Sequence, residues 1–392
     1  MRISGPTAYI ALYSALYAGF GVASPFWPKF FETRTLVPQQ IGLILAAAMV
    51  ARLVSGPVVG MLADFLGRVR LVFASCAALG TGAAVALIWA NNFWSLLLIA
   101  LVQAAALAPT TSIADALSVT AAKPRTAGKP FEYGWIRGAA SAAFVLGTLI
   151  AGQLISPADL TPIVSMNASL LIVAAGATAL VPAVTTRAVH TGPSVGAIEL
   201  HGILRISRFR ILILVSALVY GSHAMHDAFA VVRWSDAGIS IAVISFLWSE
   251  AVAAEVIVFV LIGPALVDRF GVRRAAALAV LAGAVRWSIA GVTTSVLLLL
   301  MIQPLHGLTF ALLHLACMRI MGSLIPVNLA ATAQVLYTFG SGVMTTALTV
   351  LSGVLYSLYA GAAFFPMAAL CVVALPFAWF GLAGEHRSEC SL

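Results

Sequence analysis

The sequence predicts an all-α membrane protein with 12 transmembrane helices in two pseudo-symmetric six-helix bundles. Of its 392 residues, 62% are apolar and 9% are charged, and the mean hydropathy of +1.06 lies far above that of a soluble domain. Apolar runs of about 20 residues, the length that crosses a bilayer as a helix, recur along the whole chain. A Gly/Asp/Gly/Arg turn also occurs twice, around Asp64 and Asp268, which indicates two copies of one half.

Twelve apolar runs, separated mostly by short polar segments, are the expected membrane-spanning helices. The first run has only Arg2 ahead of it and leads into Trp27-Pro28-Lys29, with no small-residue cleavage site, so we interpret it as a helix and not as a signal peptide. The expected spans are residues 7–28, 40–63, 69–90, 93–118, 135–156, 162–183, 208–233, 239–265, 274–294, 296–321, 330–358 and 361–384.

The longest hydrophilic connection, residues 185–207, divides the chain nearly in half. It predicts an N-terminal six-helix bundle over residues 1–184, a cytoplasmic linker over 185–207, and a C-terminal six-helix bundle with a short tail over 208–392. No other connection is long enough to hold a soluble catalytic domain.

The positions of Lys and Arg predict the orientation, because cytoplasmic loops accumulate positive charge. Of the 21 basic residues, 15 fall on the side that holds the N-terminus, three (Lys29, Arg34 and Arg233) on the other, and three within apolar runs. We therefore expect a multi-pass protein of the cell inner (plasma) membrane with both termini in the cytoplasm. This topology accounts for the net charge of +8, so no nucleic-acid partner is expected.

Several functional classes find no support in the sequence. It contains neither a phosphate-binding glycine loop nor a nucleophile with an aligned base, so we expect no enzyme and no ATP-driven pump. The four cysteines have no metal-like spacing, and neither a metal nor a cofactor is expected. Cys76, Cys317 and Cys371 lie in apolar runs and Cys390 lies in the tail.

The repeated turn predicts a gating latch at the membrane surface. Glycine allows helices to approach closely, the aspartate can meet the N-terminus of a neighbouring helix, and the arginines can anchor at headgroups. An ordinary cytoplasmic loop would show similar residues in one copy, but two copies at corresponding positions favour the latch. Its residues are Gly60, Asp64, Gly67, Arg68 and Arg70 in the first copy, and Asp268 and Gly271 in the second.

These five residues of the first copy resemble the loop 2–3 signature of the major facilitator superfamily, with Phe65 in place of the usual basic residue. The resemblance implies two six-helix bundles flanking a midplane cavity and alternating access by rocking of the bundles.

A narrower resemblance, to the lactose permease-like proton symporters and within them to the 3-phenylpropionate transporter group, covers nearly the whole chain. The segments that carry it are Phe26-Trp27-Pro28, Ala114-Asp115-Ala116-Leu117, Phe131-Glu132-Tyr133-Gly134-Trp135-Ile136-Arg137-Gly138, Gly221-Ser222-His223-Ala224, Ala254-Glu255-Val256, Val285-Arg286-Trp287, Leu305-His306-Gly307 and His314-Leu315-Ala316.

Ionisable residues inside the expected spans are the candidates for function, because each costs about 2.5 to 3.5 kcal/mol at a helix centre. A short loop can bring Asp115 and Arg137 side by side, either as a solute site or as an ordinary salt bridge at the membrane edge. By resemblance this pair matches the sugar-binding pair of the lactose permease, but Phe144 stands where that permease has a stacking tryptophan. Arg137 suits a carboxylate, with Arg52 as a second candidate.

Glu255, Arg286 and His306 lie near the middle of three consecutive spans and are expected to form a polar cluster. Glu255 is the proton-carrier candidate, because a changing distance to Arg286 would load and release a proton. A static structural ion pair is the alternative. Where the lactose permease has an acid three residues after its histidine, this chain has Thr309, so the permease's proton carrier cannot be transferred by position. Glu250 is the reserve carrier.

The seventh span contributes His223, His226 and Asp227, of which His223 and Asp227 are expected to share one helix face. A histidine–aspartate pair can bind protons near neutral pH, whereas a lone embedded histidine is usually a packing residue. No third ligand at matching spacing supports a metal.

Small and aromatic residues give two further expectations. Gly138, Gly147 and Gly152 are expected to be close-packing contacts between helices. Tyr17, Phe26, Trp248 and Phe310 are candidates to line an apolar ligand cavity.

Together these features predict a secondary active transporter that imports a small organic solute with protons, most simply an aromatic carboxylate such as 3-phenylpropionate. Its partners would be the solute, protons and the lipid bilayer, and it would act as a monomer. An oligosaccharide or nucleoside symporter and a drug effluxer remain alternatives. A receptor or scaffold would be expected to carry a soluble signalling extension, and a channel would need a repeated charged or carbonyl-rich filter, and neither is evident.

Overall fold

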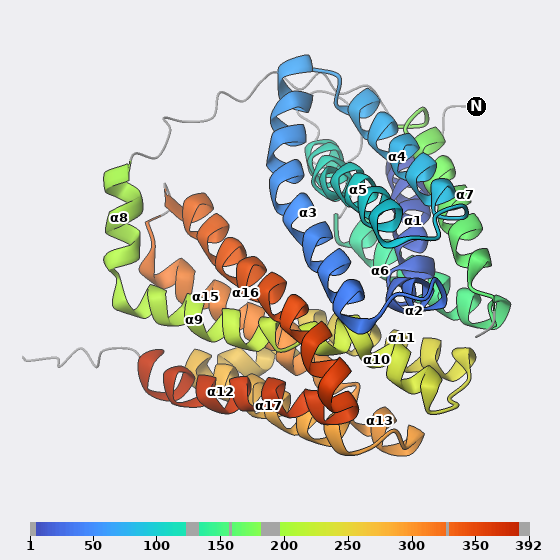
Figure 1. Cartoon of the computed structure of the whole chain (residues 1–392). Coiled ribbons are helices and arrows are strands. Elements are labelled where there is room, and N and C mark those ends of the chain that lie inside the picture. The colour runs from blue at the N-terminus through green and yellow to red at the C-terminus, as the bar shows by residue number, and fades with distance from the viewer. Residues whose placement is uncertain (1–4, 123–132, 157–158, 182–196, 327–328, 384–392) are drawn as a thin grey trace, which may run out of the picture. The chain divides into compact units, whose positions relative to one another are not determined.

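The computed structural model describes the chain except residues 1–4, 123–132, 157–158, 182–196, 327–328 and 384–392. The described residues are helical apart from turns and one isolated bridge between Ser156 and Asp159. The helices in Figure 1 are α1 Gly5–Ala23, α2 Trp27–Thr33, α3 Pro38–Leu66, α4 Val69–Ala86, α5 Phe93–Ala122, α6 Tyr133–Leu154, α7 Thr161–Ala177, α8 Ala197–Arg205, α9 Ser207–Gly221, α10 Ala224–Asp236, α11 Ile241–Ile257, η1 Val258–Ile262, α12 Gly263–Val292, α13 Val296–Ile302, α14 Leu305–Gly307, η2 Leu308–Leu312, α15 Leu313–Leu324, α16 Ala330–Tyr359, η4 Ala360–Phe364, α17 Phe365–Pro376 and η5 Phe377–Gly381.

Helix length and hydropathy agree with the predicted all-α membrane fold. Eight described helical segments are long and apolar enough to cross a membrane, and nine when α1 and α2, bent by 44°, count as one. Two of these segments, Ile241–Val292 and Ala330–Gly381, each run over 52 residues, which is enough for two spans. Positive φ angles interrupt them at Gly271 and Ala360. Counting each as two spans and adding the shorter apolar helix α7 accounts for the 12 expected helices.

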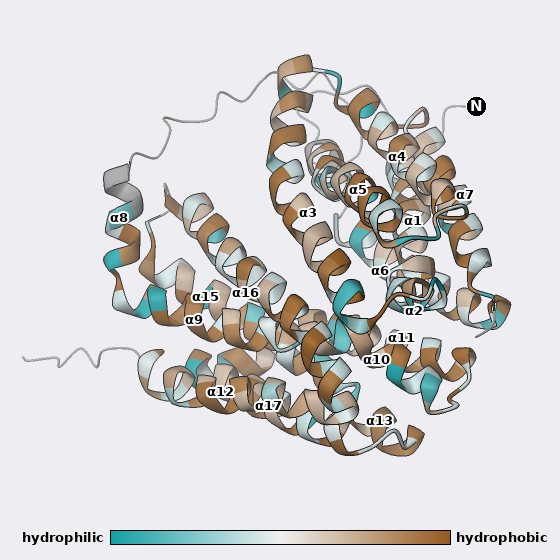
Figure 2. Ribbon diagram, in the orientation of Figure 1, coloured by the Kyte–Doolittle hydropathy of each residue, from teal (hydrophilic) through white to brown (hydrophobic). Residues whose placement is uncertain are grey.

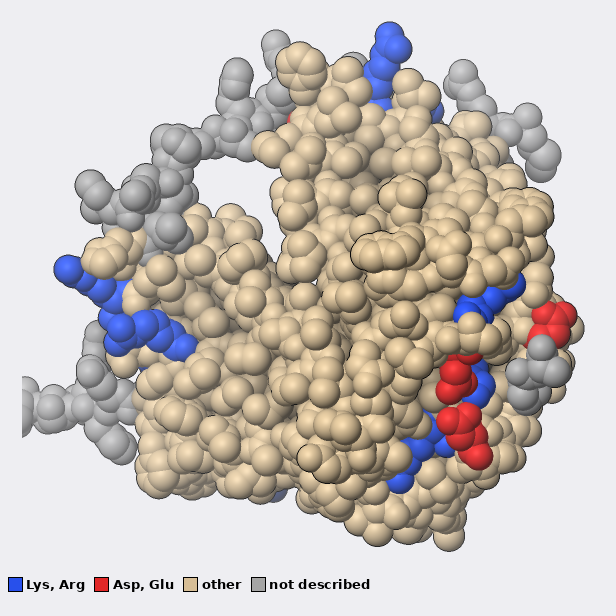
Figure 3. All heavy atoms as spheres, in the orientation of Figure 1, with Lys and Arg blue, Asp and Glu red and all other residues tan. Residues whose placement is uncertain are grey.

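The surface of the helices is that of a protein surrounded by lipid. Figure 2 shows apolar residues along most of each long helix. On the face drawn in Figure 3, Lys, Arg, Asp and Glu are confined to a few places and most of the surface is uncharged. Large side chains such as Phe65 and Phe380 are 87% and 76% exposed, which is favourable only against an apolar solvent.

Contacts group the chain into two compact units. The first comprises Met1–Gly192, Met225–Ala253 and Thr349–Ala360, and the second comprises Pro193–Ala224, Ala254–Leu348 and Gly361–Leu392. Of the predicted linker, residues 185–196 lie outside the described residues, and most of the remainder forms α8. The bundle boundaries at 184 and 208 stay a prediction.

Glycines allow close packing of helices within the first unit. There α1 contacts α6 and α7, α4 contacts α5 and α7, and α3 contacts α5. A methyl group at Gly147 of α6 would lie 2.6 Å from the Ala18 carbonyl oxygen of α1, so only glycine permits this approach. Gly152 packs as tightly against Ser245 of α11. Gly138 has open space around it, so the expected close contact at this third glycine is wrong.

An ionic cluster also lies within the first unit. The Lys29 ammonium, on α2, contacts both the Glu32 carboxylate and Asp236 Oδ1 at the end of α10, the latter at 2.7 Å. Lys29 is only 9% exposed, so its charge needs these two partners. From the sequence, Lys29 was expected only to be one of three basic residues on the side opposite the N-terminus, and its ion pairs were not predicted.

In the second unit, α12 is the central helix. It contacts α15, η2 and α17, while α9 contacts α17 and α15. Gly307 of α14 would place a methyl group 2.6 Å from the Ala254 carbonyl oxygen, so this glycine brings α14 against the end of α11.

The two copies of the repeated turn share a backbone feature and differ in their contacts. Gly67 and Gly271 both have positive φ, 60° and 78°, in the region that favours glycine. Asp268 pairs with Arg319 at 2.7 Å, whereas the Asp64 carboxylate has neither a hydrogen bond nor an ion pair among the described residues, and the Asp64 backbone carbonyl accepts from the Gly67 N–H. Neither Gly60 nor Gly67 has an atom near its missing side chain, so the expected close helix approach there is wrong and Gly67 acts through its backbone conformation.

The arginines of the first copy lie at the start of α4. Arg68 precedes α4, and Arg70 Nη1 donates to the carbonyl oxygen of Val181 at 2.6 Å. The turn is therefore tied to the chain segment that follows α7.

We expect Gly147→Ala to destabilise the protein by about 1–3 kcal/mol, because its methyl group must push α1 from α6. Gly138→Ala, in the same helix but in open space, should be neutral or slightly stabilising, because alanine favours helix by about 1 kcal/mol. Thermal unfolding in detergent measures both variants. Equal melting temperatures would contradict the close contact.

Candidate functional site

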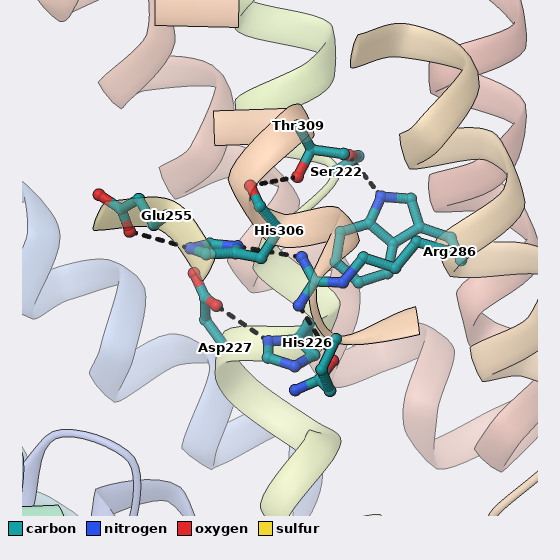
Figure 4. A network of polar contacts seen from close by, with 9 residues as sticks. Ser222, His226, Asp227, Glu255, Arg286, His306 and Thr309 are labelled. Carbon is teal, nitrogen blue, oxygen red and sulfur yellow. Dashed lines mark hydrogen bonds and ion pairs between the residues drawn. The ribbon is translucent and has the colours of Figure 1, made fainter. Parts of the chain in front are cut away.

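A buried polar cluster in the second unit connects α11, α12 and α14. His306 Nε2 lies 3.2 Å from Glu255 Oε2, and His306 Nδ1 lies 3.0 Å from Arg286 Nη1. Arg286 Nη2 donates to Gln303 Oε1 at 3.1 Å. Figure 4 shows the imidazole of His306 between the carboxylate and the guanidinium. The structure thus brings together the three residues that the sequence placed on consecutive spans.

Hydrogen-bond geometry fixes the form of the His306 ring. A guanidinium can only donate, so Nδ1 must accept from Arg286, and Nε2 then carries the hydrogen that is donated to Glu255. A second hydrogen on Nδ1 would face the guanidinium hydrogens. The arrangement therefore fits a neutral His306 that donates its Nε2 hydrogen to the Glu255 carboxylate.

Breaks in the helices position these side chains. Gln303 and Pro304 form a turn between α13 and α14, because proline removes a helical hydrogen bond. Gly307 then allows α14 to reach the backbone of Ala254, next to Glu255. A π-helical turn follows each partner of the Glu255–His306 hydrogen bond, η1 after Glu255 and η2 after His306. Such turns are rare and concentrate at functional sites.

Arg286 is enclosed by protein and is hydrogen-bonded to His306 and Gln303. Arg286 is 0% exposed, and its guanidinium lies 4.5 Å from the centre of the Trp287 ring. The Trp287 indole N–H donates to Ser222 Oγ at 2.8 Å. Thr309, at the position of the permease's acid, donates its hydroxyl to the carbonyl oxygen of His306 and is 0% exposed. These bonds hold the guanidinium rigidly beside His306.

A second polar cluster lies in the first unit, where α1, α5 and α6 meet. Asp115 Oδ1 accepts hydrogen bonds from the hydroxyls of Tyr13 at 2.5 Å and Tyr133 at 2.6 Å. Arg137 Nη1 lies 3.6 Å from the same oxygen and donates to the Tyr17 hydroxyl at 2.6 Å. The side chains of Arg137 and Asp115 are 44% and 40% exposed, so both remain accessible.

The tyrosines of this cluster were not predicted from the sequence as polar partners of Asp115. Tyr13 and Tyr17 are one turn apart on α1 and stack in parallel, with ring centres 5.9 Å apart. Tyr133 and Arg137 are one turn apart on α6. The spacing of four residues was a signal that each pair shares a helix face, but it does not say which carboxylate the hydroxyls reach.

Arg52 is a membrane cation without a protein partner among the described residues. It lies on α3, eleven residues after Ile41 and eleven before Ala63, so all three share one line on the helix. Ile41 and Ala63 are each 1% exposed, whereas Arg52 is exposed. The line faces the protein at both ends, so Arg52 points to the protein side of α3. The structure forms no hydrogen bond or ion pair between Arg52 and Asp115.

The histidines of the seventh span are separated by a helix break. Ser222 and His223 form a turn between α9 and α10, so His223 directly precedes the helix that carries Asp227, and the expected common face of the two stays a prediction. His226 Nδ1 lies 3.3 Å from Asp227 Oδ1, and its ring stacks on Trp248 at 5.0 Å. His223 packs against the rings of Trp287 and His306.

Glu250 occupies a different environment from Glu255. Its Oε2 is buried and has no hydrogen-bond partner among the described residues. No group of three or more His, Cys, Asp and Glu side chains in the described part of the chain has a geometry suited to a metal ion.

Comparison with known proteins identifies the family. The MFS_1 like family matches residues 7–367. The chain belongs to this family. It is 30% identical over 381 residues to the "Probable 3-phenylpropionic acid transporter" of Escherichia coli (strain K12), with 94% of this chain and 96% of that protein covered. The protein is therefore a multi-pass membrane transporter of the major facilitator type and not an enzyme.

Solved structures support the same fold. The nucleoside transporter NupG matches with a TM-score of 0.86 at 15% identity, covering 97% of this chain and 99% of that one. The D-xylose-proton symporter matches with a TM-score of 0.68 at 14% identity, covering 96% and 97%. These likenesses extend over nearly the whole chain and confirm the major facilitator fold.

We expect Arg286→Lys to lower stability by about 1–3 kcal/mol, because one ammonium cannot reproduce the bonds to both His306 and Gln303. Arg319→Lys, in an ion pair whose side chains are about 60% exposed, should change stability by less than about 1 kcal/mol. Thermal unfolding of the two purified variants tests this difference. A milder effect at Arg286 than at Arg319 would show that the cluster is loosely held.

Proposed function

We propose that the protein imports a small aromatic carboxylate, such as 3-phenylpropionate, together with protons by alternating access. The observation that carries the proposal is the Glu255–His306–Arg286 cluster, because an acid held beside a neutral imidazole and a buried cation inside a membrane protein can take up and release a proton. The similarity to a probable 3-phenylpropionic acid transporter supports the substrate class.

In this proposal Glu255 carries the proton. Ionised Glu255 accepts the Nε2 hydrogen of His306, whose tautomer Arg286 holds. Protonation of Glu255 removes its charge and weakens its contact with His306. The end of α11, which carries Glu255, can then separate from α14. Movement and proton transfer are thereby coupled. Glu250 and the His226–Asp227 pair are the reserve carriers.

The arginines of the first unit would hold the substrate carboxylate. Arg137 has five N–H donors, of which the structure assigns one to Tyr17, and it shares its charge with Asp115. Arg52 is exposed and forms no side-chain hydrogen bond or ion pair among the described residues. A carboxylate accepts paired hydrogen bonds from a guanidinium, so both are suited to it, with His223 as a further candidate contact.

We further propose that the protein works as a monomer in the inner membrane with both termini in the cytoplasm. The repeated turns would act as the gate, with the Asp268–Arg319 pair as one of its contacts. Neither a cofactor nor a nucleic acid has a role in this mechanism, in which the proton gradient supplies the energy.

Two alternative functions share this architecture. A nucleoside or oligosaccharide symporter would recognise neutral ligands, and a drug effluxer would move solute outward. We favour the carboxylate because Arg137 is accessible and uses one of its donors on Tyr17, and exposed Arg52 forms no ion pair among the described residues, so both cations suit an anion.

We expect 3-phenylpropionate to drive saturable proton influx into proteoliposomes that contain the protein, and a disaccharide or nucleoside to drive none. Glu255→Gln should abolish this influx and uphill accumulation but retain solute exchange, because an amide cannot carry the proton. Empty liposomes are the control, since the neutral acid crosses lipid unaided. Uphill accumulation by the variant would move the carrier to Glu250, Asp227 or His306.

We expect Arg137→Ala and Arg52→Ala each to weaken 3-phenylpropionate binding by about ten- to one-hundred-fold, the value of a charge-assisted hydrogen bond. Arg34→Ala is the matched control, because Arg34 bonds Asn91 in a loop. Equilibrium binding of labelled acid to purified protein measures all three. Unchanged affinity in a folded Arg137 variant would remove that residue from the site.

A further inference from the structure

A group of aromatic rings lies beside the Glu255–His306 pair in the second unit. The Phe310 ring stacks on His306, with centres 5.6 Å apart and planes inclined by 19°. The Tyr220 ring lies 5.2 Å from Phe310. The Phe259 ring lies 6.0 Å from His314. These rings form a surface, here called the ring surface, that consists of Tyr220, Phe259, Phe310, His314 and Tyr337.

The two π-helical turns create this surface. Phe259 belongs to η1 and Phe310 belongs to η2, and the two turns contact each other. A π turn inserts one residue and rotates the side chains that follow, at a cost in hydrogen-bond geometry. Two adjacent π turns, each carrying a phenylalanine, are therefore expected where the rotated side chains have a functional role.

A chain of hydroxyl groups supports one edge of the ring surface. The Tyr220 and Tyr337 hydroxyls lie 3.0 Å apart, and the Tyr337 hydroxyl lies 3.2 Å from His314 Nδ1. Tyr337 is 3% exposed, so it hydrogen-bonds the His314 imidazole from the buried side. In whichever direction the chain donates, His314 Nε2 has no hydrogen-bond partner among the described residues.

Two of these rings are partly uncovered. Phe310 is 40% exposed, and Phe259 is 44% exposed. Phe310 covers His306, whose Nε2 lies 3.2 Å from the Glu255 carboxylate. Ionisable groups at membrane depth face a protein interior or a water-filled cavity and not lipid. The exposed ring faces therefore border the same region as the Glu255 carboxylate.

We propose that the ring surface binds the aromatic ring of the transported solute, with Phe310 and Phe259 contacting its faces and His314 Nε2 its edge. This inference rests on the proposed import of an aromatic carboxylate. It places ring recognition in the second unit, next to the proposed proton carrier Glu255. A solute ring bound against Phe310 would contact the side chain that stacks on His306. Solute binding would thereby be linked to the Glu255–His306 pair.

The first experiment compares transport of 3-phenylpropionate with that of 3-cyclohexylpropionate, which has the same carboxylate and chain but no π-system. The wild-type protein should favour the phenyl acid by about three- to ten-fold in KM, the value of one aromatic pair. Phe310→Leu should remove this preference, and Phe310→Tyr should retain it. Phe380→Leu, whose phenylalanine is 76% exposed, is the matched control and should behave as wild type. A Phe310→Leu protein with an unchanged preference would overturn the proposal.

The second experiment separates failure of the subsite from failure of the proposed function. His314→Cys is treated with a water-soluble maleimide, and peptide mass spectrometry measures the labelling at this position. We expect labelling that 3-phenylpropionate slows and 3-cyclohexylpropionate slows less. Such protection without any proton influx would retain the subsite and refute proton-coupled import. Absence of labelling, or labelling that neither acid slows, would overturn the ring surface as a binding site even if import is observed.

Discussion

The full burial of the Arg286 guanidinium is the constraint on which the second unit depends. A charge inside a membrane protein needs polar partners, and the Arg286 guanidinium donates to His306 and Gln303 and lies over Trp287. These partners come from a helix that breaks at Pro304, so that both a glutamine and a histidine can reach one side chain. Fixing His306 in one tautomer then gives Glu255 a donor. The carboxylate is thereby the one member of the cluster that can change its protonation without breaking the contact between Arg286 and His306.

The two polar clusters solve the burial of charge differently. In the first unit, tyrosine hydroxyls satisfy Asp115, and Arg137 stays accessible with unused donors. In the second unit the cation is enclosed and the acid is partly open, with 30% of the Glu255 side chain exposed. An accessible cation suits an anionic solute, and a partly open acid beside a fixed donor suits a proton. In the proposed mechanism, this difference separates solute binding in the first unit from proton binding in the second.

Small residues and helix irregularities place these groups. Gly307 and Gly147 bring backbones together where any side chain would separate them, and so set the distances between Glu255 and His306 and between α1 and α6. The π turns then rotate Phe259 and Phe310 beside the coupling pair. Geometry that depends on fractions of an ångström is thus built from residues without functional groups. For that reason the glycines matter to function as much as the ionisable residues do.

By itself the sequence determined the membrane fold, the family and the meeting of Glu255, Arg286 and His306. Hydropathy and span length follow from composition, and rare charges on consecutive spans must find one another because lipid offers no other partner. Only the tertiary structure decided that Tyr13 and Tyr133 bond Asp115, that Asp227 pairs with His226, and that a side chain at Gly138 or Gly60 would meet no neighbouring helix among the described residues. A tyrosine serves equally well in a core and at a polar site, and a glycine in a contact and in open space, so neither residue reveals its role in one dimension. These choices depend on which helix lies opposite, and only packing supplies that information.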